Sequence, residues 1–260
     1  MTTAVIVDAV RTPGGKRNGK LKDWHPADLA AHVLKALQER NGLDPALVDD
    51  VVMGCVMQVG EQALNIGRNA VLAAGWPESV PATTVDRQCG SSQQAIHFAA
   101  QGVIAGAYDV VVAAGVEAMT RTPMGSSVVK DLGFPFPKSM FDRYAETGLP
   151  PQGIGAEMIA DEYGLSRTDL DAFGAESQRR ALQATEEGRF EREIVPVPVV
   201  VDGKEELFTS DEGIRPGTTV ETLANLKPAF KEDGKITAGN SSQITDGAAA
   251  VLIMSEEKAK

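Results

Sequence analysis

Short apolar runs alternate with helical patterns along the first half of the chain. Residues 28–40, for example, repeat apolar side chains at helical spacing, and Gly42 follows where such a helix would end. Alternation of this kind is typical of βαβ units around a largely parallel sheet. The pattern predicts an α/β fold, with strands at residues 4–10, 50–56, 82–85 and 108–116 and helices at residues 28–40, 65–74 and 91–105.

The helix predicted at residues 91–105 differs from the others. Its apolar and small residues leave only a narrow polar stripe, so we expect it to be mostly buried. The strand predicted at residues 108–116 is apolar on both faces, which is typical of a central strand that is covered on both sides.

The pattern changes after residue 119. Residues 120–151 hold many Gly, Pro and Met residues without a sustained period, a stretch too long for an ordinary connection. Further on, helices are expected at residues 155–163 and 168–187, and strands at residues 194–201 and 247–254. We therefore expect a layered α/β core, a five-stranded mixed sheet with helices on both faces, from residues 1–119 and 241–260, with residues 120–240 as an inserted loop region.

The composition is that of an ordinary folded protein, but its charge is one-sided. Hydrophobic residues make up 43% and charged residues 23% of the 260 residues, and the formal net charge is -11. Nucleic acids and anionic membranes attract a surplus of Lys and Arg, so neither is an expected partner. No run reaches the ~18 apolar residues of a membrane span. Because Cys55 and Cys89 are the two cysteines, we expect free thiols in a reducing, cytoplasmic setting.

Cys89 carries the strongest chemical signal. It stands in the segment VDRQCGSS, residues 85–92, between a short predicted strand and the predicted helix at residues 91–105. The amino-terminus of a helix, with its free backbone N–H groups, favours a thiolate and an oxyanion. Gly90 leaves space beside the sulfur for a substrate. These features favour a cysteine that is acylated, and the alternative is a small buried hydrophobe.

Two other residues are weaker candidates. Cys55 lies in the apolar run of a predicted strand and is expected in the core. His97 could serve as a base, but its helix would hold it about 12 Å along the axis from Cys89, so a core histidine is the preferred interpretation. No metal-ligand cluster or phosphate-binding glycine motif is present in the sequence.

Several motifs around Cys89 resemble one known family. VDRQC, ending at Cys89, looks like the thiolase nucleophile motif. GNSS at residues 239–242 with DGAAA at residues 246–250 resembles that family's mid-chain signature. The coenzyme A-binding loop is matched by DEGIRP at residues 211–216 and LKPAF at residues 226–230. Further support comes from VRTP at residues 10–13 and GVEAM at residues 115–119. The matches follow the family order, so the chain resembles the amino-terminal half of a thiolase.

The resemblance implies an acyltransferase of lipid and fatty acid metabolism with a thiolase-like layered fold. In such enzymes, which include acetyl-CoA acetyltransferase and 3-ketoacyl-CoA thiolase, the nucleophilic cysteine is acylated by a thioester, and a second cysteine moves the α-proton of acetyl-CoA. Cys89 matches the nucleophile, and its backbone N–H would help to form an oxyanion hole. Acetyl-CoA and acyl-CoA would be substrates, with no permanently bound cofactor.

The same correspondence implies residues that bind coenzyme A. Ser242 should contact the pantetheine, Arg215 the adenine end, and Phe230 and Ala238 the tunnel walls. Residues 120–240 would cover the active site. Gln152 stands where many relatives have a methionine that lines the acyl pocket, so a preference for short acyl chains does not follow.

The family's activating histidine, second cysteine and water-holding asparagine belong to its second half, whose motifs do not occur in this chain. The isolated chain is therefore predicted to hold a nucleophile without a base and to be inactive. A ketosynthase-type condensing enzyme and a non-catalytic coenzyme A-binding or assembly module are the alternatives, although Gln88 and the DGAAA signature favour a thiolase.

The resemblance also implies self-association. Residues 58–69 and the strand leading to Cys89 resemble the part through which thiolases pair. An unpaired apolar edge strand would be an aggregation liability, so we expect a homodimer or homotetramer.

Overall fold

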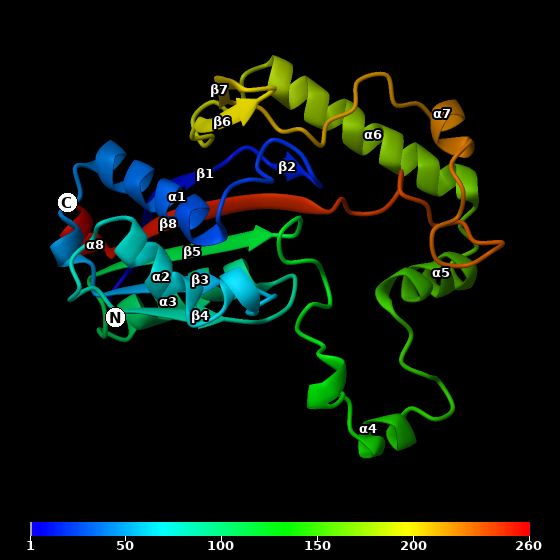
Figure 1. Ribbon diagram of the computed structural model, residues 1–260, viewed down its shortest axis with the longest axis horizontal. Helices are drawn as coiled ribbons and strands as arrows, with labels where there is room; N and C mark the ends of the chain where they lie inside the picture. Colours follow the sequence, from blue (N-terminus) through cyan, green and yellow to red (C-terminus); the bar gives the residue numbers. More distant parts are fainter. Residues whose placement is uncertain (1) are drawn as a thin grey trace. The chain divides into compact units, whose positions relative to one another are not determined.

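A mixed β-sheet is the frame of the computed structural model, which describes residues 2–260 (Figure 1). Its strands are β1 (Ala4–Arg11), β3 (Asp50–Gly54), β4 (Ala82–Val85), β5 (Val110–Ala118) and β8 (Thr245–Ser255). They lie in the order β1-β8-β5-β3-β4, and the two residues of β2 (Gly15–Lys16) also pair with β8. β3 is parallel to β4 and β5, whereas β8 is antiparallel to β1 and β5. The predicted mixed sheet is confirmed, and the two-residue β2 makes it six-stranded rather than five-stranded.

The chain forms two units. The first contains the residues up to Ser127, Phe190–Glu212 and the residues from Ile244 onward. The second contains Val128–Arg189 and Gly213–Gln243. The sheet belongs to the first unit, and so does Phe190–Glu212, in contrast to the sequence prediction, which places these residues in the loop region at residues 120–240.

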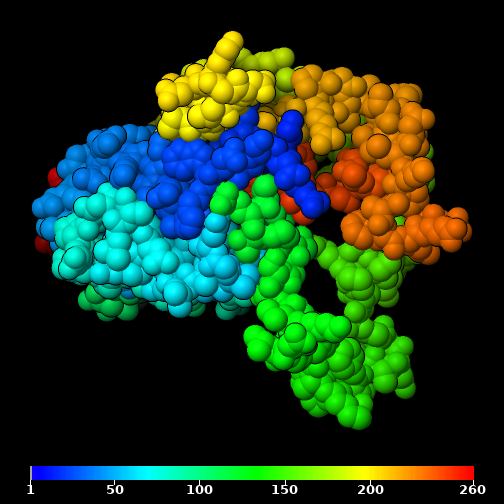
Figure 2. All heavy atoms as spheres, in the orientation of Figure 1, coloured from blue at the N-terminus to red at the C-terminus, as the bar shows by residue number. Residues whose placement is uncertain are grey.

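A two-stranded hairpin explains this difference. Strands β6 (Val197–Val201) and β7 (Lys204–Phe208) pair antiparallel. The side chains of Val197, Val199 and Phe208 are buried in the main hydrophobic cluster of the first unit. Alternating apolar residues thus join the hairpin to the core, and Figure 2 shows its yellow atoms lying on the blue amino-terminal segments.

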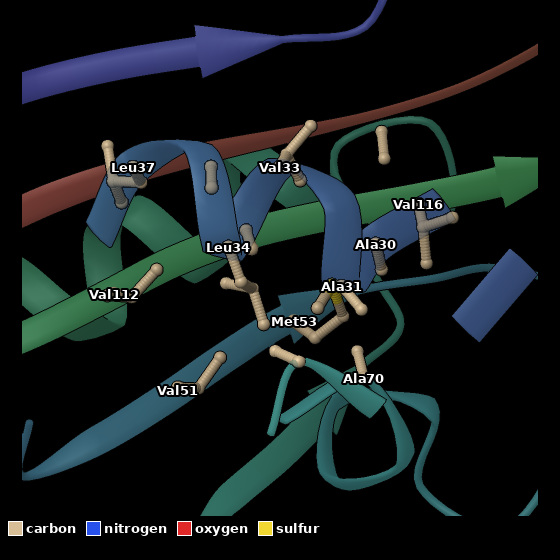
Figure 3. Close-up of a cluster of buried hydrophobic side chains, with 14 of the residues drawn as sticks. Ala30, Ala31, Val33, Leu34, Leu37, Val51, Met53, Ala70, Val112 and Val116 are labelled. Carbon is tan, nitrogen blue, oxygen red and sulfur yellow. The ribbon is translucent and has the colours of Figure 1, made fainter. Parts of the chain in front are cut away.

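Two helices cover one face of the sheet. Helix α1 (Pro26–Asn41) begins with the ring of His25 as its cap and ends at Gly42, whose φ of 55° is left-handed. Helix α2 (Ile66–Ala73) lies beside it. Figure 3 shows Leu34 and Val33 of α1 above Val51, Met53 and other apolar side chains of the strands. This face is sealed by hydrophobic packing, because these four side chains are fully buried.

Helix α3 (Ser91–Ile104) packs against the opposite face. Its buried positions form one stripe at four-residue spacing, Ser91, Ala95, Ala99 and Val103. Phe98 and Ile104, by contrast, are 43% and 46% exposed. The prediction of a mostly buried helix is therefore wrong for this chain. A helix on a single sheet buries only one stripe, and its outer apolar side chains need a further layer.

The second unit is mainly helical. It contains α4 (Lys138–Arg143), α5 (Gln152–Glu162), α6 (Arg167–Glu186) and α7 (Val220–Ala224). Ser166 starts α6 with a capping box, because its hydroxyl accepts from the N–H of Asp169 and the Asp169 carboxylate accepts from the N–H of Ser166. The short helix α8 (Glu256–Ala259) belongs to the first unit.

A membrane-spanning helix is not found among residues 2–260, because none of their helices combines the necessary length and apolar character.

Candidate active site

Cys89 lies on the surface at the junction that the sequence predicted. It follows β4 and directly precedes Gly90, the residue at which α3 is capped. The helix that starts there is 14 residues long, and its amino-terminus carries a partial positive charge that favours an anion nearby. An exposed thiol in this field can act as a nucleophile.

The turn that holds Cys89 is fixed by two side chains. Gln88 has a left-handed φ of 48°, which is uncommon for a residue other than glycine. Its N–H donates to Oδ1 of Asp86 at 2.7 Å. Ser91 Oγ accepts from the N–H of Arg87 at 2.9 Å and donates to the carbonyl of Gln88 at 2.6 Å. Sequence reasoning missed these roles of Asp86 and Ser91, although Asp and Ser around a turn are a recognisable signal.

Two glycines of the sheet make room for the start of α3. A Cβ on Gly54, at the end of β3, would overlap the backbone of Ser91 and Ser92. A Cβ on Gly115 of β5 would overlap the Ser92 side chain. At Gly90 a Cβ would meet only ordinary contacts. The first two glycines therefore place the helix against the sheet, whereas packing within the chain does not require glycine beside the sulfur.

The second cysteine has the opposite environment. Cys55 is 1% exposed, and Nε2 of Gln62 lies 3.4 Å from its sulfur. Burial, with smaller contributions from the charges of Glu117 and Asp86, raises the pKa of the Cys55 thiol to about 12. Its assignment to the core is thus confirmed. His97 lies on the exposed part of α3, so the preferred interpretation of a core histidine is wrong.

The other predicted site residues lie in the second unit, and all of them are exposed. Gln152 is the first residue of α5. Arg215 follows the boundary between the units, and its N–H donates to Oε1 of Gln178 at 2.8 Å. Phe230, Ala238 and Ser242 lie in the irregular segment before β8.

The second unit brings the segments that carry these residues together. The ring of Phe230 lies against Gly153, where a Cβ would overlap it, so Phe230 lies next to the start of α5. Pro228 forms an antiparallel bridge with Thr237, which sets the segments of Phe230 and Ala238 side by side. Nε2 of Gln243, next to Ser242, donates to the carbonyl of Gly213 at 2.7 Å.

The residues just before Arg215 are anchored in the first unit. Asp211 accepts from both terminal nitrogens of Arg11, at 2.7 and 3.1 Å, and from the N–H of Gly14 at 2.7 Å. Arg11 also donates to Glu193 at 2.6 Å. Two motifs that are 200 residues apart, VRTP and DEGIRP, thus meet through one ion pair.

Within the described residues, no group of three His, Cys, Asp or Glu side chains could hold a metal ion.

Comparisons with known proteins show the family of this chain. The family described as "Thiolase, N-terminal domain" matches residues 4–257. The chain is 45% identical to a steroid 3-ketoacyl-CoA thiolase, FadA6, of Mycobacterium tuberculosis, with all of this chain and 64% of that protein covered. It is 43% identical to a 3-ketoacyl-CoA thiolase of Bacillus subtilis, with all of this chain and 67% of that protein covered.

A solved structure shows the same fold. The crystal structure of the Bacillus anthracis acetyl-CoA acetyltransferase superposes with a TM-score of 0.86 at 38% identity, covering 100% of this chain and 67% of that one. The chain thus spans about two thirds of the length of these relatives. The chain belongs to the thiolase family, with a match to its amino-terminal domain that extends from residue 4 to residue 257.

Proposed function

We propose that this chain is part of an acyltransferase that forms or cleaves 3-ketoacyl-CoA through an acyl-cysteine on Cys89. The thiolate of Cys89 attacks the carbonyl of an acyl-CoA, and coenzyme A leaves as the thiolate and takes up a proton. A base removes the α-proton of acetyl-CoA, and the resulting carbanion attacks the acyl-cysteine, which releases Cys89 and 3-ketoacyl-CoA. Thiolysis is the same sequence reversed.

The placement of Cys89 is the observation that carries this proposal. Its sulfur is exposed, it directly precedes the cap of a 14-residue helix, and the turn around it is held by Asp86 and Ser91. A preorganised helix amino-terminus stabilises both the thiolate and the oxyanion that forms when the thioester is attacked.

Coenzyme A thioesters are the proposed substrates, bound without a permanent cofactor. Arg215, Phe230, Ala238 and Ser242 would contact coenzyme A, and Gln152 the acyl group. All five are exposed in the second unit, on segments that are linked to one another. Since the net charge is -11, the phosphates need local donors such as Arg215.

The catalytic base is proposed to lie outside these 260 residues, so that the isolated chain is inactive. The exposed Phe98 and Ile104 on α3 offer an apolar surface to the part that supplies the base.

Self-association through residues 58–69 and β4, which is an edge strand of the sheet, would give a homodimer or homotetramer. A monodisperse monomer in sedimentation at micromolar concentration would contradict this assembly.

Limited alkylation tests the role of Cys89. Brief treatment of the native chain with iodoacetamide, followed by peptide mapping, should label Cys89 at least about tenfold faster than Cys55. A Cys89→Ser variant is the control and should lose the fast label only. Labelling of Cys55 first would contradict the proposal.

A thiolysis assay with acetoacetyl-CoA tests the missing base. The purified chain should show no sustained turnover. Steady turnover that is lost in the Cys89→Ser variant would mean that a residue of this chain supplies the base. His97 would be the first residue to replace.

A further inference from the structure

Two helices of the second unit bury a carboxylate each. Glu157 of α5 is 2% exposed and Asp171 of α6 is 1% exposed. A buried carboxylate is costly unless it is paired and hydrogen-bonded. The groups that donate hydrogen bonds to these two carboxylates therefore indicate which segments the carboxylates hold in place.

Glu157 holds a backbone turn. Its two oxygens accept from the N–H of Lys235 at 2.9 Å and from the N–H of Ile236 at 2.8 Å. A Cβ on Gly234 would overlap the same carboxylate, so the backbone lies directly on it. Glu157 thus fixes the segment that leads into Ala238.

Asp171 connects two further segments. It accepts from Nε of Arg167 at 2.8 Å and from Nδ2 of Asn240 at 3.0 Å. The same Arg167 donates to the carbonyls of Leu223 and Leu226 at 2.7 and 3.0 Å. The ion pair of Arg167 with the buried Asp171 therefore holds both the chain that precedes Phe230 and the turn that precedes Ser242.

Asn240 extends this network into the turn itself. Its Oδ1 accepts from the N–H of Thr237 at 2.8 Å, and its Nδ2 also donates to the carbonyl of Lys235 at 3.1 Å. Thr237 is fully buried and its hydroxyl accepts from the N–H of Gly239 at 3.1 Å. Ala238, within this turn, and Ser242, which follows it, are in contrast exposed.

We propose that Glu157 and Asp171 are positioning residues for coenzyme A: they hold residues 223–242 in the binding conformation, so that Phe230, Ala238 and Ser242 are in place before the ligand arrives. This inference rests on the proposed function, because it takes Ser242 as the pantetheine contact and Phe230 and Ala238 as walls of the binding tunnel. Preorganisation raises affinity because fewer groups must be ordered on binding. Neither carboxylate touches the ligand.

Glu157→Gln and Asp171→Asn test the proposal, since each keeps the shape of the side chain and removes one acceptor. Isothermal titration of the 260-residue chain should show coenzyme A binding that is weakened about tenfold. Binding of adenosine 3′,5′-bisphosphate, which represents the adenine end, should change less than about twofold, because Arg215 is held elsewhere, by Gln178. Glu162→Gln and Glu186→Gln, which change exposed carboxylates on the same helices, should leave both affinities unchanged.

Hydrogen exchange provides a second measurement without ligand. The amides of residues 235–240 should exchange at least about tenfold faster in both variants, whereas those of β5 should keep their protection. Should Asp171→Asn fail to fold, Asn240→Ala removes the link to the turn while Arg167 still pairs with Asp171.

The outcomes separate the two proposals. Faster exchange with unchanged coenzyme A affinity would overturn the positioning role. Unchanged exchange would overturn it as well. A wild-type chain that does not bind coenzyme A would contradict the proposed binding site, and hydrogen exchange alone would then decide whether the two carboxylates hold residues 235–240.

Discussion

In the first unit, Leu34, Met53 and Val112 are completely buried between α1 and the sheet, whereas in the second unit the most buried side chains include Glu157 and Asp171. Both hydrophobic clusters found among the described residues consist of first-unit residues. Hydrophobic packing is non-directional and stabilises a sheet as a whole. Charged hydrogen bonds are directional and fix individual loops. The chain thus uses packing where it needs a stable frame and buried carboxylates where exposed segments must keep one conformation.

The largest effect is expected from a cavity in the first unit. Leu34→Ala should lower the free energy of unfolding by about 2–5 kcal/mol, because it removes a fully buried side chain from a close-packed core. Urea unfolding followed by circular dichroism measures it. Leu72→Ala, at a position that is 45% exposed on α2, is the matched control and should change stability by less than about 0.5 kcal/mol. Equal losses for the two would show that packing does not dominate this unit.

A smaller effect is expected at alkaline pH. The pKa of the buried Cys55 is raised from 9.0 to about 12, so the folded chain keeps a proton that the unfolded chain releases. The contribution of this thiol to the free energy of unfolding should therefore be fully present below pH 9. It should fall between pH 9 and 12, by about 1.4 kcal/mol per pH unit at most.

The comparison of wild type with Cys55→Ala isolates this contribution, because other groups titrate in the same range. One of them is Tyr108, whose hydrogen bond to Asp50 raises its pKa to about 12. The difference in unfolding free energy between the two proteins should shrink as the pH rises from 9. A constant difference would mean that water reaches the thiol in the folded chain.

In the second unit, loss of a helix cap should have a local effect. Ser166→Ala removes the hydroxyl that accepts from the N–H of Asp169 at 3.1 Å and should destabilise α6 by about 1 kcal/mol. Hydrogen exchange of the first turn of α6 reports this loss. Thr168→Ala, an exposed position in the same turn, should not increase exchange. If both variants behave alike, the capping box does not determine where the helix starts.

The smallest effect is expected on the surface of α6. Glu176 pairs with Arg179 and Arg180, both at 2.7 Å, and the pairing lowers its pKa to about 2. Because the Glu176 side chain is 41% exposed, solvent screens the pairs. Glu176→Gln should leave the urea midpoint unchanged, in contrast to the buried Asp171 on the same helix. A clear shift would mean that exposed charge pairs, too, hold this unit together.

The sequence by itself determined the five longer strands of the main sheet, the α/β class and the place of Cys89 between β4 and α3, because these follow from local periodicity and from residues next to one another. It also identified Cys55 as a core residue from the apolar run around it. Only the tertiary structure decided that Val197, Val199 and Phe208 join the first unit and that Phe98 remains exposed, since burial depends on which surfaces meet. Asp171 and Asn240 are 69 residues apart, and no local pattern shows that a carboxylate on one helix holds a turn so distant in the chain.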